Sequence, residues 1–235
     1  MSSGELWTLG GFATGALILF FVARSRGLAT PGMRLVALSG ILGGVLGARI
    51  TEWFFGVAQF ANHNPGAFLD PRNGGKSLVG GLIFGWMSVE IAKKRLGIKR
   101  STGDLWALAL PAGEAVGRIG CFLNGCCFGL PFSGFCVAYQ HGAWRHPTQI
   151  YSSLSAALLF AVLWKLRAKL PREGDLFRLY LLLYGISRFS IEFVRQRDFI
   201  FGALSLVQVL CLGAAIYAAF SLFSPRQTPQ PNPAL

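Results

Sequence analysis

The sequence predicts an all-α integral membrane protein with about seven transmembrane helices, and three observations support this fold class. Of the 235 residues, 53% are hydrophobic and only 14% are charged, which is too apolar for an ordinary soluble domain. Apolar stretches long enough to cross a bilayer recur along nearly the whole chain. The basic residues behind the formal net charge of +12 gather in the short segments between these stretches.

Seven apolar runs predict the helices in chain order. They are approximately Leu6–Ala23, Leu35–Phe55, Leu78–Ala92, Leu105–Phe128, Ile150–Leu166, Leu176–Val194 and Phe201–Phe223. The third run is short and begins close to Gly80-Gly81, so we expect this helix to be tilted or broken. Residues 1–223 are therefore expected to form a single polytopic membrane domain. Residues 224–235 are rich in proline and polar groups, and are expected to be disordered.

The distribution of Lys and Arg predicts the orientation. One side of the membrane receives fourteen basic residues: Arg24, Arg26, Arg34, Lys93, Lys94, Arg95, Lys99, Arg100, Lys165, Arg167, Lys169, Arg172, Arg178 and Arg226. The other side receives five: Arg72, Lys76, Arg145, Arg195 and Arg197. Because cytoplasmic loops carry the excess of Lys and Arg, the N-terminus is expected outside and the C-terminus in the cytoplasm. The basic residues form no face with interleaved aromatics, which argues against a nucleic-acid partner.

Three arginines fall inside predicted helices, all in the outer half of the membrane. A charged side chain at this depth costs at least about 2.5 kcal/mol and usually marks a functional site. A structural ion pair within the helix is the alternative for each, and the spacing allows three: Arg49 with Glu52, Arg118 with Glu114 and Arg188 with Glu192. Three cations at one depth favour a shared anion, because they repel one another in a low dielectric. A phospholipid phosphate is the natural anion there, and the guanidinium fork suits its oxygens.

Three further polar residues are candidates for the same site. Asn124, near the outer end of the fourth helix, can hydrogen-bond a lipid headgroup, although a helix cap or a loop contact explains it equally well. His146 lies in the loop before the fifth helix, and imidazole gains and loses a proton near neutral pH, which suits acid–base catalysis. A solvated or capping histidine is the alternative. Tyr184 shares a helix face with Arg188.

Four cysteines, Cys121, Cys126, Cys127 and Cys136, lie within sixteen residues. Their spacing matches no standard zinc or iron–sulfur pattern, so no metal site is predicted. Cys121 falls in an apolar run, where cysteine behaves as a small hydrophobic residue. The other three are expected on the oxidising side of the membrane, where one disulfide among them is plausible.

Five segments resemble the prolipoprotein diacylglyceryl transferase family. GRIGCFLNG (117–125) is similar to the family signature G-R-x-G-N-F-x-N-x-E, and RHPTQIY (145–151) is similar to H-P-x-Q-L-Y. YGISRFSIEFVRQRD (184–198) resembles Y-G-x-x-R-F-x-x-E-x-x-R-x-x-D, while GARITEWFF (47–55) and VGGLIFG (79–85) resemble the second helix and the H-G-G-L-I-G turn. The resemblance runs in order from about residue 40 to residue 198.

The resemblance implies a multi-pass enzyme of the bacterial cytoplasmic membrane. Such an enzyme moves the diacylglyceryl group of phosphatidylglycerol to the lipobox cysteine of a preprolipoprotein signal peptide and releases glycerol 1-phosphate. The partners are then phosphatidylglycerol, the signal peptide and other membrane lipids, and no cofactor or metal is implied. The residues implied in catalysis are Arg118, Arg188 and His146, and those implied in substrate binding are Asn124, Tyr184, Arg49, Glu192, Arg195, Gly80 and Gly81.

The chain also departs from the family pattern at four positions: Val79 replaces a histidine, Cys121 an asparagine, Cys126 a glutamate and Ser152 a glutamate. Three other functions therefore stay open. The chain could transfer a different group, it could bind or move lipids without catalysis, or it could be a membrane thiol or metal protein that uses the cysteine cluster.

Overall fold

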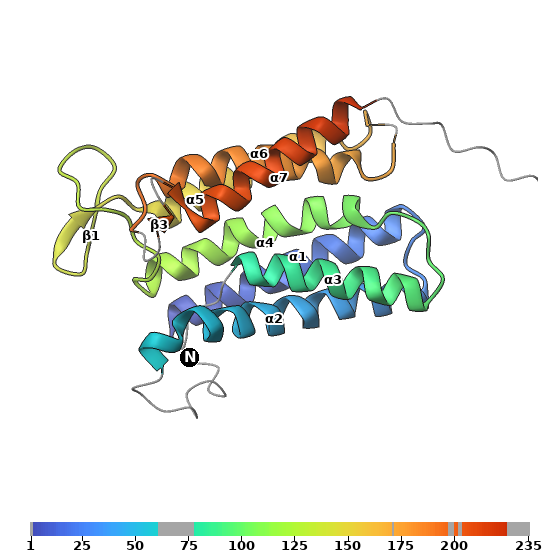
Figure 1. The fold of residues 1–235 in the computed structure, drawn as a ribbon, viewed down its shortest axis with the longest axis horizontal. Helices are drawn as coiled ribbons and strands as arrows, with labels where there is room; N and C mark the ends of the chain where they lie inside the picture. The colour runs from blue at the N-terminus through green and yellow to red at the C-terminus, as the bar shows by residue number, and fades with distance from the viewer. Residues whose placement is uncertain (1, 61–77, 171, 197–199, 202–203, 225–235) are drawn as a thin grey trace, which may run out of the picture. The chain divides into compact units, whose positions relative to one another are not determined.

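The structure, a computed structural model, describes residues 2–60, 78–170, 172–196, 200–201 and 204–224, with the backbone alone at 52–60, 78–79 and 200–201. Seven α-helices account for most of these residues: α1 Ser3–Ser25, α2 Pro31–Phe60, α3 Leu78–Arg95, α4 Gly103–Leu123, α5 Thr148–Leu166, α6 Asp175–Glu192 and α7 Leu206–Phe223 (Figure 1). Two short antiparallel hairpins join them: β1 Ala138–Gln140 with β2 Ala143–Arg145, and β3 Ile200–Phe201 with β4 Leu204–Ser205. The predicted all-helical architecture is confirmed, and the four strands are additions to it.

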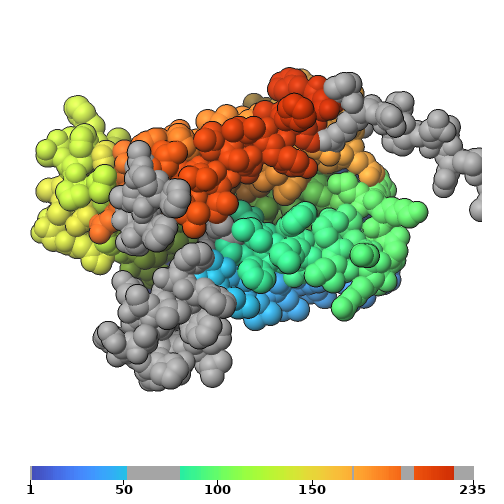
Figure 2. All heavy atoms as spheres, viewed as in Figure 1, coloured from blue at the N-terminus to red at the C-terminus, as the bar shows by residue number. Residues whose placement is uncertain are grey.

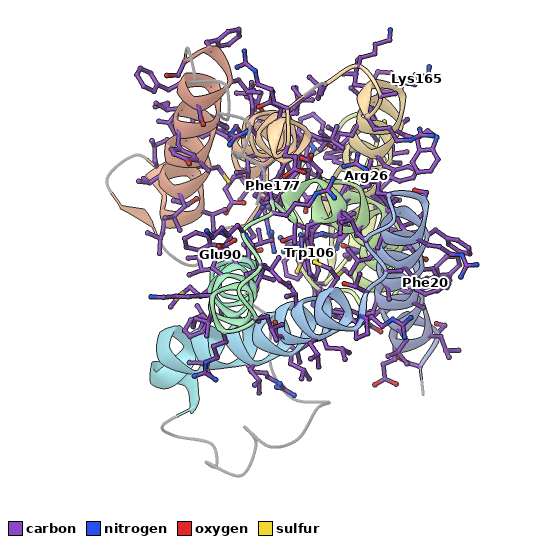
Figure 3. All side chains as sticks on the ribbon, turned by 90° about the vertical axis from the view of Figure 1, so that its right-hand side faces the viewer. Phe20, Arg26, Glu90, Trp106, Lys165 and Phe177 are labelled. Atoms are coloured by element: carbon purple, nitrogen blue, oxygen red, sulfur yellow. The ribbon has the colours of Figure 1, made fainter. Side chains whose placement is uncertain are left out.

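Four helices in the described part of the chain are long and apolar enough to cross a membrane: Ser3–Ser25, Pro31–Thr51, Thr148–Leu166 and Leu206–Phe223. Large apolar side chains on them point outward, as Phe20 of α1 does in Figure 3 and as Leu158 of α5 and Phe220 of α7 do by their exposure. Outward apolar side chains are expected where a helix faces lipid rather than water. The count of seven spans and the orientation of the termini stay predictions.

Several helix boundaries differ from those predicted by a few residues, and local capping explains two of these differences. α4 ends at Leu123 rather than near residue 128, because Gly125 adopts φ +65° and the Cys126 N–H returns to the Cys121 carbonyl at 3.1 Å. α7 begins at Leu206 rather than near residue 201. Ser205 accepts a hydrogen bond from the Gln208 N–H at 3.2 Å, and the Gln208 side chain accepts one from the Ser205 N–H at 2.9 Å.

Two compact units make up the chain, and the first contains Met1–Val22 and Ser101–Leu235. Within it, α1 lies against α4 at glycines on both helices: a Cβ on Gly11 would come within 2.7 Å of the Gly113 carbonyl oxygen. α6 approaches α7 in the same way at Gly185, which faces the Cys211 carbonyl. Small residues at helix contacts are typical of membrane bundles, because they let backbones approach closely.

The second unit spans Ala23–Arg100 and consists mainly of α2 and α3. A Cβ added to Gly80 would lie 2.7 Å from the Gly47 carbonyl oxygen, and one added to Gly81 would lie 3.1 Å from the Gly44 carbonyl oxygen. Gly80 and Gly81 therefore serve the contact between these two helices.

At one end of the first unit, α4 and α6 end and α5 and α7 begin (Figure 1). The segments 124–147 and 193–196 cover this end, and we call them the cap. The β1–β2 hairpin projects beyond this end, as Figure 2 shows in yellow-green beside the orange and red helices. The segment around Gly129 crosses the cap: the Gly129 N–H donates to His146 O at 3.0 Å, and the Leu130 N–H donates to Val194 O at 2.9 Å. The segment thereby ties the start of α5 to the end of α6.

Candidate functional site

Arg188 and Glu192 form a buried ion pair near the end of α6. The Arg188 Nη2 atom lies 2.6 Å from Glu192 Oε2, and the two side chains are only 8% and 6% exposed. Glu192 also accepts a hydrogen bond from the hydroxyl of Ser205, the residue that caps α7, at 3.4 Å. The pair thus connects α6 to the start of α7. Its four-residue spacing places both groups on one helix face, as the sequence predicted.

A second ion pair lies on α4, where Arg118 reaches back one turn to Glu114. Its Nε and Nη2 atoms approach the same carboxylate oxygen at 3.1 and 3.0 Å, and both side chains are 12% exposed. The ion-pair alternative considered for Arg118 and Arg188 is therefore confirmed for both. A paired arginine keeps free N–H groups, since the guanidinium carries five donors.

One residue of each ion pair, Glu114 and Arg188, lines a common polar pocket formed by α4, α5 and α6. Its polar lining consists of Glu114, Ser152, Ser155, Tyr184, Ser187 and Arg188. The guanidinium groups of Arg118 and Arg188 both interact electrostatically with the Tyr184 hydroxyl, and the two guanidinium groups repel each other. The structure therefore brings together Arg118, Tyr184, Arg188 and Glu192, four of the residues singled out from the sequence.

Two hydrogen-bond donors in this pocket are buried and have no partner among the described residues. They are the Nη1 group of Arg188 and the hydroxyl of Tyr184. A buried polar group left without a hydrogen bond costs about 1–3 kcal/mol, so such groups are rare unless they serve a purpose. One cationic donor and one neutral donor, beside a second arginine, match the needs of an anionic oxygen ligand such as a phosphate.

Arg195 lies just beyond α6, where its backbone pairs with Gly129 across the cap. Its charge acts on Arg188, so it adds to the positive field around the pocket. Asn124 lies elsewhere. It is the C-cap of α4, its side chain lies against Gly4, and its Oδ1 accepts a hydrogen bond from the Ser2 hydroxyl at 3.3 Å. This contact corresponds to the loop-contact alternative for Asn124, and the residue does not line the pocket.

His146 lies in the cap and not among the residues that line the pocket. Its ring stacks on Phe132 with centroids 4.3 Å apart, and its Nδ1 atom is 3.3 Å from the Tyr151 hydroxyl. That hydroxyl donates to the Cys136 carbonyl at 2.9 Å. The imidazole is thus held between two aromatic side chains at the entrance to α5.

The remaining predicted site residues belong to the second unit. Arg49 is half-buried on α2, and Gly80 and Gly81 form the contact with α2 described above. The side chains of Glu52, the expected partner of Arg49, and of Val79 lie outside the described residues.

Sequence reasoning missed two serines of the pocket. The hydroxyl groups of Ser155 on α5 and Ser187 on α6 hydrogen-bond to each other and join the two helices at the pocket wall. Ser155 is the third serine of the segment YSSLS (151–155), and Ser187 directly precedes Arg188. A polar residue next to an intramembrane arginine is a signal that could have identified Ser187.

All five cysteines are free, so the disulfide expected among Cys126, Cys127 and Cys136 is not formed in this structure. Instead, the Sγ atoms of Cys121, Cys126 and Cys127 lie within 4.8 Å of one another. The sequence showed four cysteines close together but not which three sulfur atoms meet, because the tight turn at Gly125 decides this.

Comparisons with known proteins agree with the motifs. A model of the prolipoprotein diacylglyceryl transferase family matches residues 6–224. The chain is 36% identical over 185 residues to the phosphatidylglycerol–prolipoprotein diacylglyceryl transferase of Nitratidesulfovibrio vulgaris (strain DP4), covering 73% of this chain and 69% of that protein. It is 33% identical over 197 residues to the protein of the same name from Clostridium tetani, covering 79% and 77%. The protein of the same name from Symbiobacterium thermophilum is 31% identical over 209 residues, which cover 83% of this chain and 77% of that protein.

Proposed function

The chain belongs to the prolipoprotein diacylglyceryl transferase family, and on this premise we propose that it transfers a diacylglyceryl group from phosphatidylglycerol to a prolipoprotein. The acceptor is the thiol of the lipobox cysteine in the signal peptide. The sulfur forms a thioether with the glyceryl carbon, the carbon–oxygen bond to the phosphate breaks, and glycerol 1-phosphate leaves with the electron pair.

The observation that carries this proposal is the pocket in which two buried donors, Arg188 Nη1 and the Tyr184 hydroxyl, have no partner among the described residues and lie beside a second arginine, Arg118. Both donors can donate to phosphate oxygens, and the positive charge of Arg118 lies close to the Tyr184 hydroxyl. Negative charge grows on the phosphate as its bond to carbon breaks. Donors fixed in a dry site stabilise that charge without reorganising, which is the largest single contribution in many enzymes.

Other residues take supporting roles in this proposal. Glu192 holds Arg188 in place, and Arg195 adds positive charge at the entrance. The nucleophile belongs to the peptide, and its thiol must lose a proton because the thiolate is the reactive form. His146, whose imidazole lies in the cap near the start of α5, is the group that accepts this proton in the proposal.

Asn124, Arg49, Gly80 and Gly81 remain proposed lipid contacts on the strength of the sequence resemblance alone. The same holds for a multi-pass placement in the bacterial cytoplasmic membrane with the N-terminus outside, and for one membrane domain over residues 1–223. In that orientation, the end of the first unit that carries the hairpin faces outward, where a signal peptide presents its lipobox.

The full chain in phosphatidylglycerol vesicles with a fluorescent lipobox peptide tests the function. Mass spectrometry follows the peptide, while an enzymatic assay follows glycerol phosphate. We expect a diacylglyceryl adduct and glycerol phosphate in equal amounts, and neither product with phosphatidylethanolamine vesicles or with a peptide whose cysteine is serine. A different adduct mass would show that another group is transferred. Binding of phosphatidylglycerol without either product, beside an active family member, would replace the proposal with lipid binding.

A further inference from the structure

Three thiols lie close together outside the polar pocket, at the end of α4. Cys121 lies in the last turn of this helix, and Cys126 and Cys127 lie in the loop that follows. Their three Sγ atoms are all within 4.8 Å of one another. A zinc–sulfur bond of about 2.3 Å places the sulfurs of a shared ion about 4 Å apart, so this separation suits three ligands of one ion.

The loop that presents these thiols is fixed by buried side chains of α5. The Cys126 carbonyl accepts a hydrogen bond from Gln149 Nε2 at 2.6 Å, and the Cys127 carbonyl accepts one from Thr148 Oγ1 at 2.7 Å. Thr148 and Gln149 are each only 1% exposed. The arrangement is therefore anchored in the core of the first unit and not in solvent.

The backbone of Cys127 supports the same conclusion. It adopts φ +61°, in the left-handed region that a residue with a side chain rarely enters. Such a conformation persists only where the surroundings over-determine it, and it is common at ligand sites. Here it turns Cys127 back toward Cys121, so the chain carries strain at the residue that completes the cluster.

Charge around the cluster favours an anionic assembly. Three thiolates and one divalent cation carry a net charge of about −1, and three thiolates with a monovalent cation carry about −2. The charges of Arg118 and Arg195 act on Cys127, and that of Arg118 also acts on Cys121. Two fixed cations beside the thiols therefore offset the residual charge. Cys126 is exposed, which leaves a route for an ion from solvent.

From this geometry we propose that Cys121, Cys126 and Cys127 bind one thiophilic d¹⁰ cation, Zn²⁺ or Cu⁺. Thiolates are soft ligands, so they select these ions over Mg²⁺ and Ca²⁺, which prefer oxygen. Three sulfurs satisfy Cu⁺ by themselves, whereas Zn²⁺ adds a water as its fourth ligand. The two sites share the charges of Arg118 and Arg195, but none of the three cysteines lines the polar pocket.

The test uses the full chain, reduced and freed of metal in detergent without lipid or peptide. Zn²⁺ and, in a separate anaerobic experiment, Cu⁺ are titrated against a coloured chelator. We expect one ion per chain, with affinity reduced more than about tenfold in each of Cys121→Ser, Cys126→Ser and Cys127→Ser. Cys136→Ser and Cys211→Ser, which change cysteines outside the cluster, are the matched controls and keep the wild-type affinity.

Circular dichroism and thermal unfolding of the metal-free variants show whether each substitution leaves the fold intact. Absence of binding while all five thiols react with a thiol reagent would overturn the proposal, as would binding that survives Cys127→Ser. A disulfide within the cluster in chain isolated without reductant, together with no binding after reduction, would overturn it in favour of a redox pair. Because no lipid or peptide is present, none of these outcomes depends on transferase activity.

Discussion

Arg188 and Glu192 meet at 2.6 Å on one face of α6, and the Nη1 group of the same arginine has no hydrogen-bond partner among the described residues. One end of the guanidinium is thus fixed by the protein, and the other end is available in the pocket. A carboxylate that holds an arginine in this way limits its rotation, so less entropy is lost when the free end binds a ligand. Arg188 can therefore form a structural ion pair and also contact a ligand, whereas the sequence analysis treated these two roles as alternatives.

Replacing Glu192 with glutamine should destabilise the fold strongly. The substitution keeps the shape but leaves the Arg188 charge buried without its partner, which costs about 3–5 kcal/mol in free energy of unfolding. Thermal unfolding in detergent, followed by circular dichroism, measures the change. Glu90→Gln is the control, because Glu90 is 47% exposed and its pair with Lys93 is worth at most about 1 kcal/mol. Equal unfolding temperatures for the two variants would contradict a buried pair.

Tyr184→Phe should reduce transfer and leave stability unchanged or slightly increased. The hydroxyl has no hydrogen-bond partner among the described residues, so its removal breaks no hydrogen bond there and relieves the cost of a buried unpaired donor. It does remove a donor for the phosphate, and we expect the transfer rate to fall roughly tenfold, as a lost hydrogen bond to a charged group implies. Tyr217→Phe on α7, with a side chain 64% exposed, is the control for both measurements. Full activity in Tyr184→Phe would remove this residue from the site.

Gly11→Ala should separate α1 from α4. The new Cβ would lie 2.7 Å from the Gly113 carbonyl oxygen and 2.7 Å from the Gly117 nitrogen, and neither backbone atom can move alone. Overpacking of this kind costs about 1–3 kcal/mol, which lowers the unfolding temperature. The neighbouring Gly10→Ala should be neutral or stabilising, because its Cβ would meet only a Val116 methyl at 3.6 Å. Similar effects of the two substitutions would show that the helices do not touch at Gly11.

His146→Gln tests the proton acceptor. If the imidazole removes the thiol proton, we expect His146→Gln to lower the rate of peptide lipidation by about 10²–10⁴-fold, the usual contribution of a general base. His141→Gln is the matched control, since His141 lies in the same cap and contacts the Gly125 carbonyl through Nε2 at 2.7 Å. An unchanged lipidation rate in His146→Gln would assign the proton to another group.

Most of the fold could be predicted because helices that face lipid consist of long runs of apolar residues, which are visible in the sequence. Apolar runs located all seven helices, and spacing of four residues predicted the pairs of Arg118 and Arg188. The start of α7 was missed although Ser205 and Gln208 stand at capping-box spacing, because the apolar run continues through the β3–β4 hairpin. Local capping chemistry here outweighed hydropathy.

The site could be predicted only where its residues share a helix. The pocket depends on how α4, α5 and α6 pack, and the bond between Ser155 and Ser187 joins residues thirty-two positions apart. The three-thiol cluster depends on one left-handed turn at Gly125 and on hydrogen bonds from α5. Neither relation is encoded in the spacing of residues along the chain.

The most direct test of the phosphate site compares Arg188→Gln with Arg178→Gln in phosphatidylglycerol vesicles. Both arginines lie on α6 and pair with a carboxylate, Arg178 with Asp175 at 2.8 Å, but only Arg188 lines the pocket. The account predicts that Arg188→Gln lowers peptide lipidation and glycerol phosphate release together by about 10²–10³-fold, while Arg178→Gln keeps the wild-type rate. A folded Arg188→Gln variant with full activity, or an equal loss in Arg178→Gln, would contradict the account.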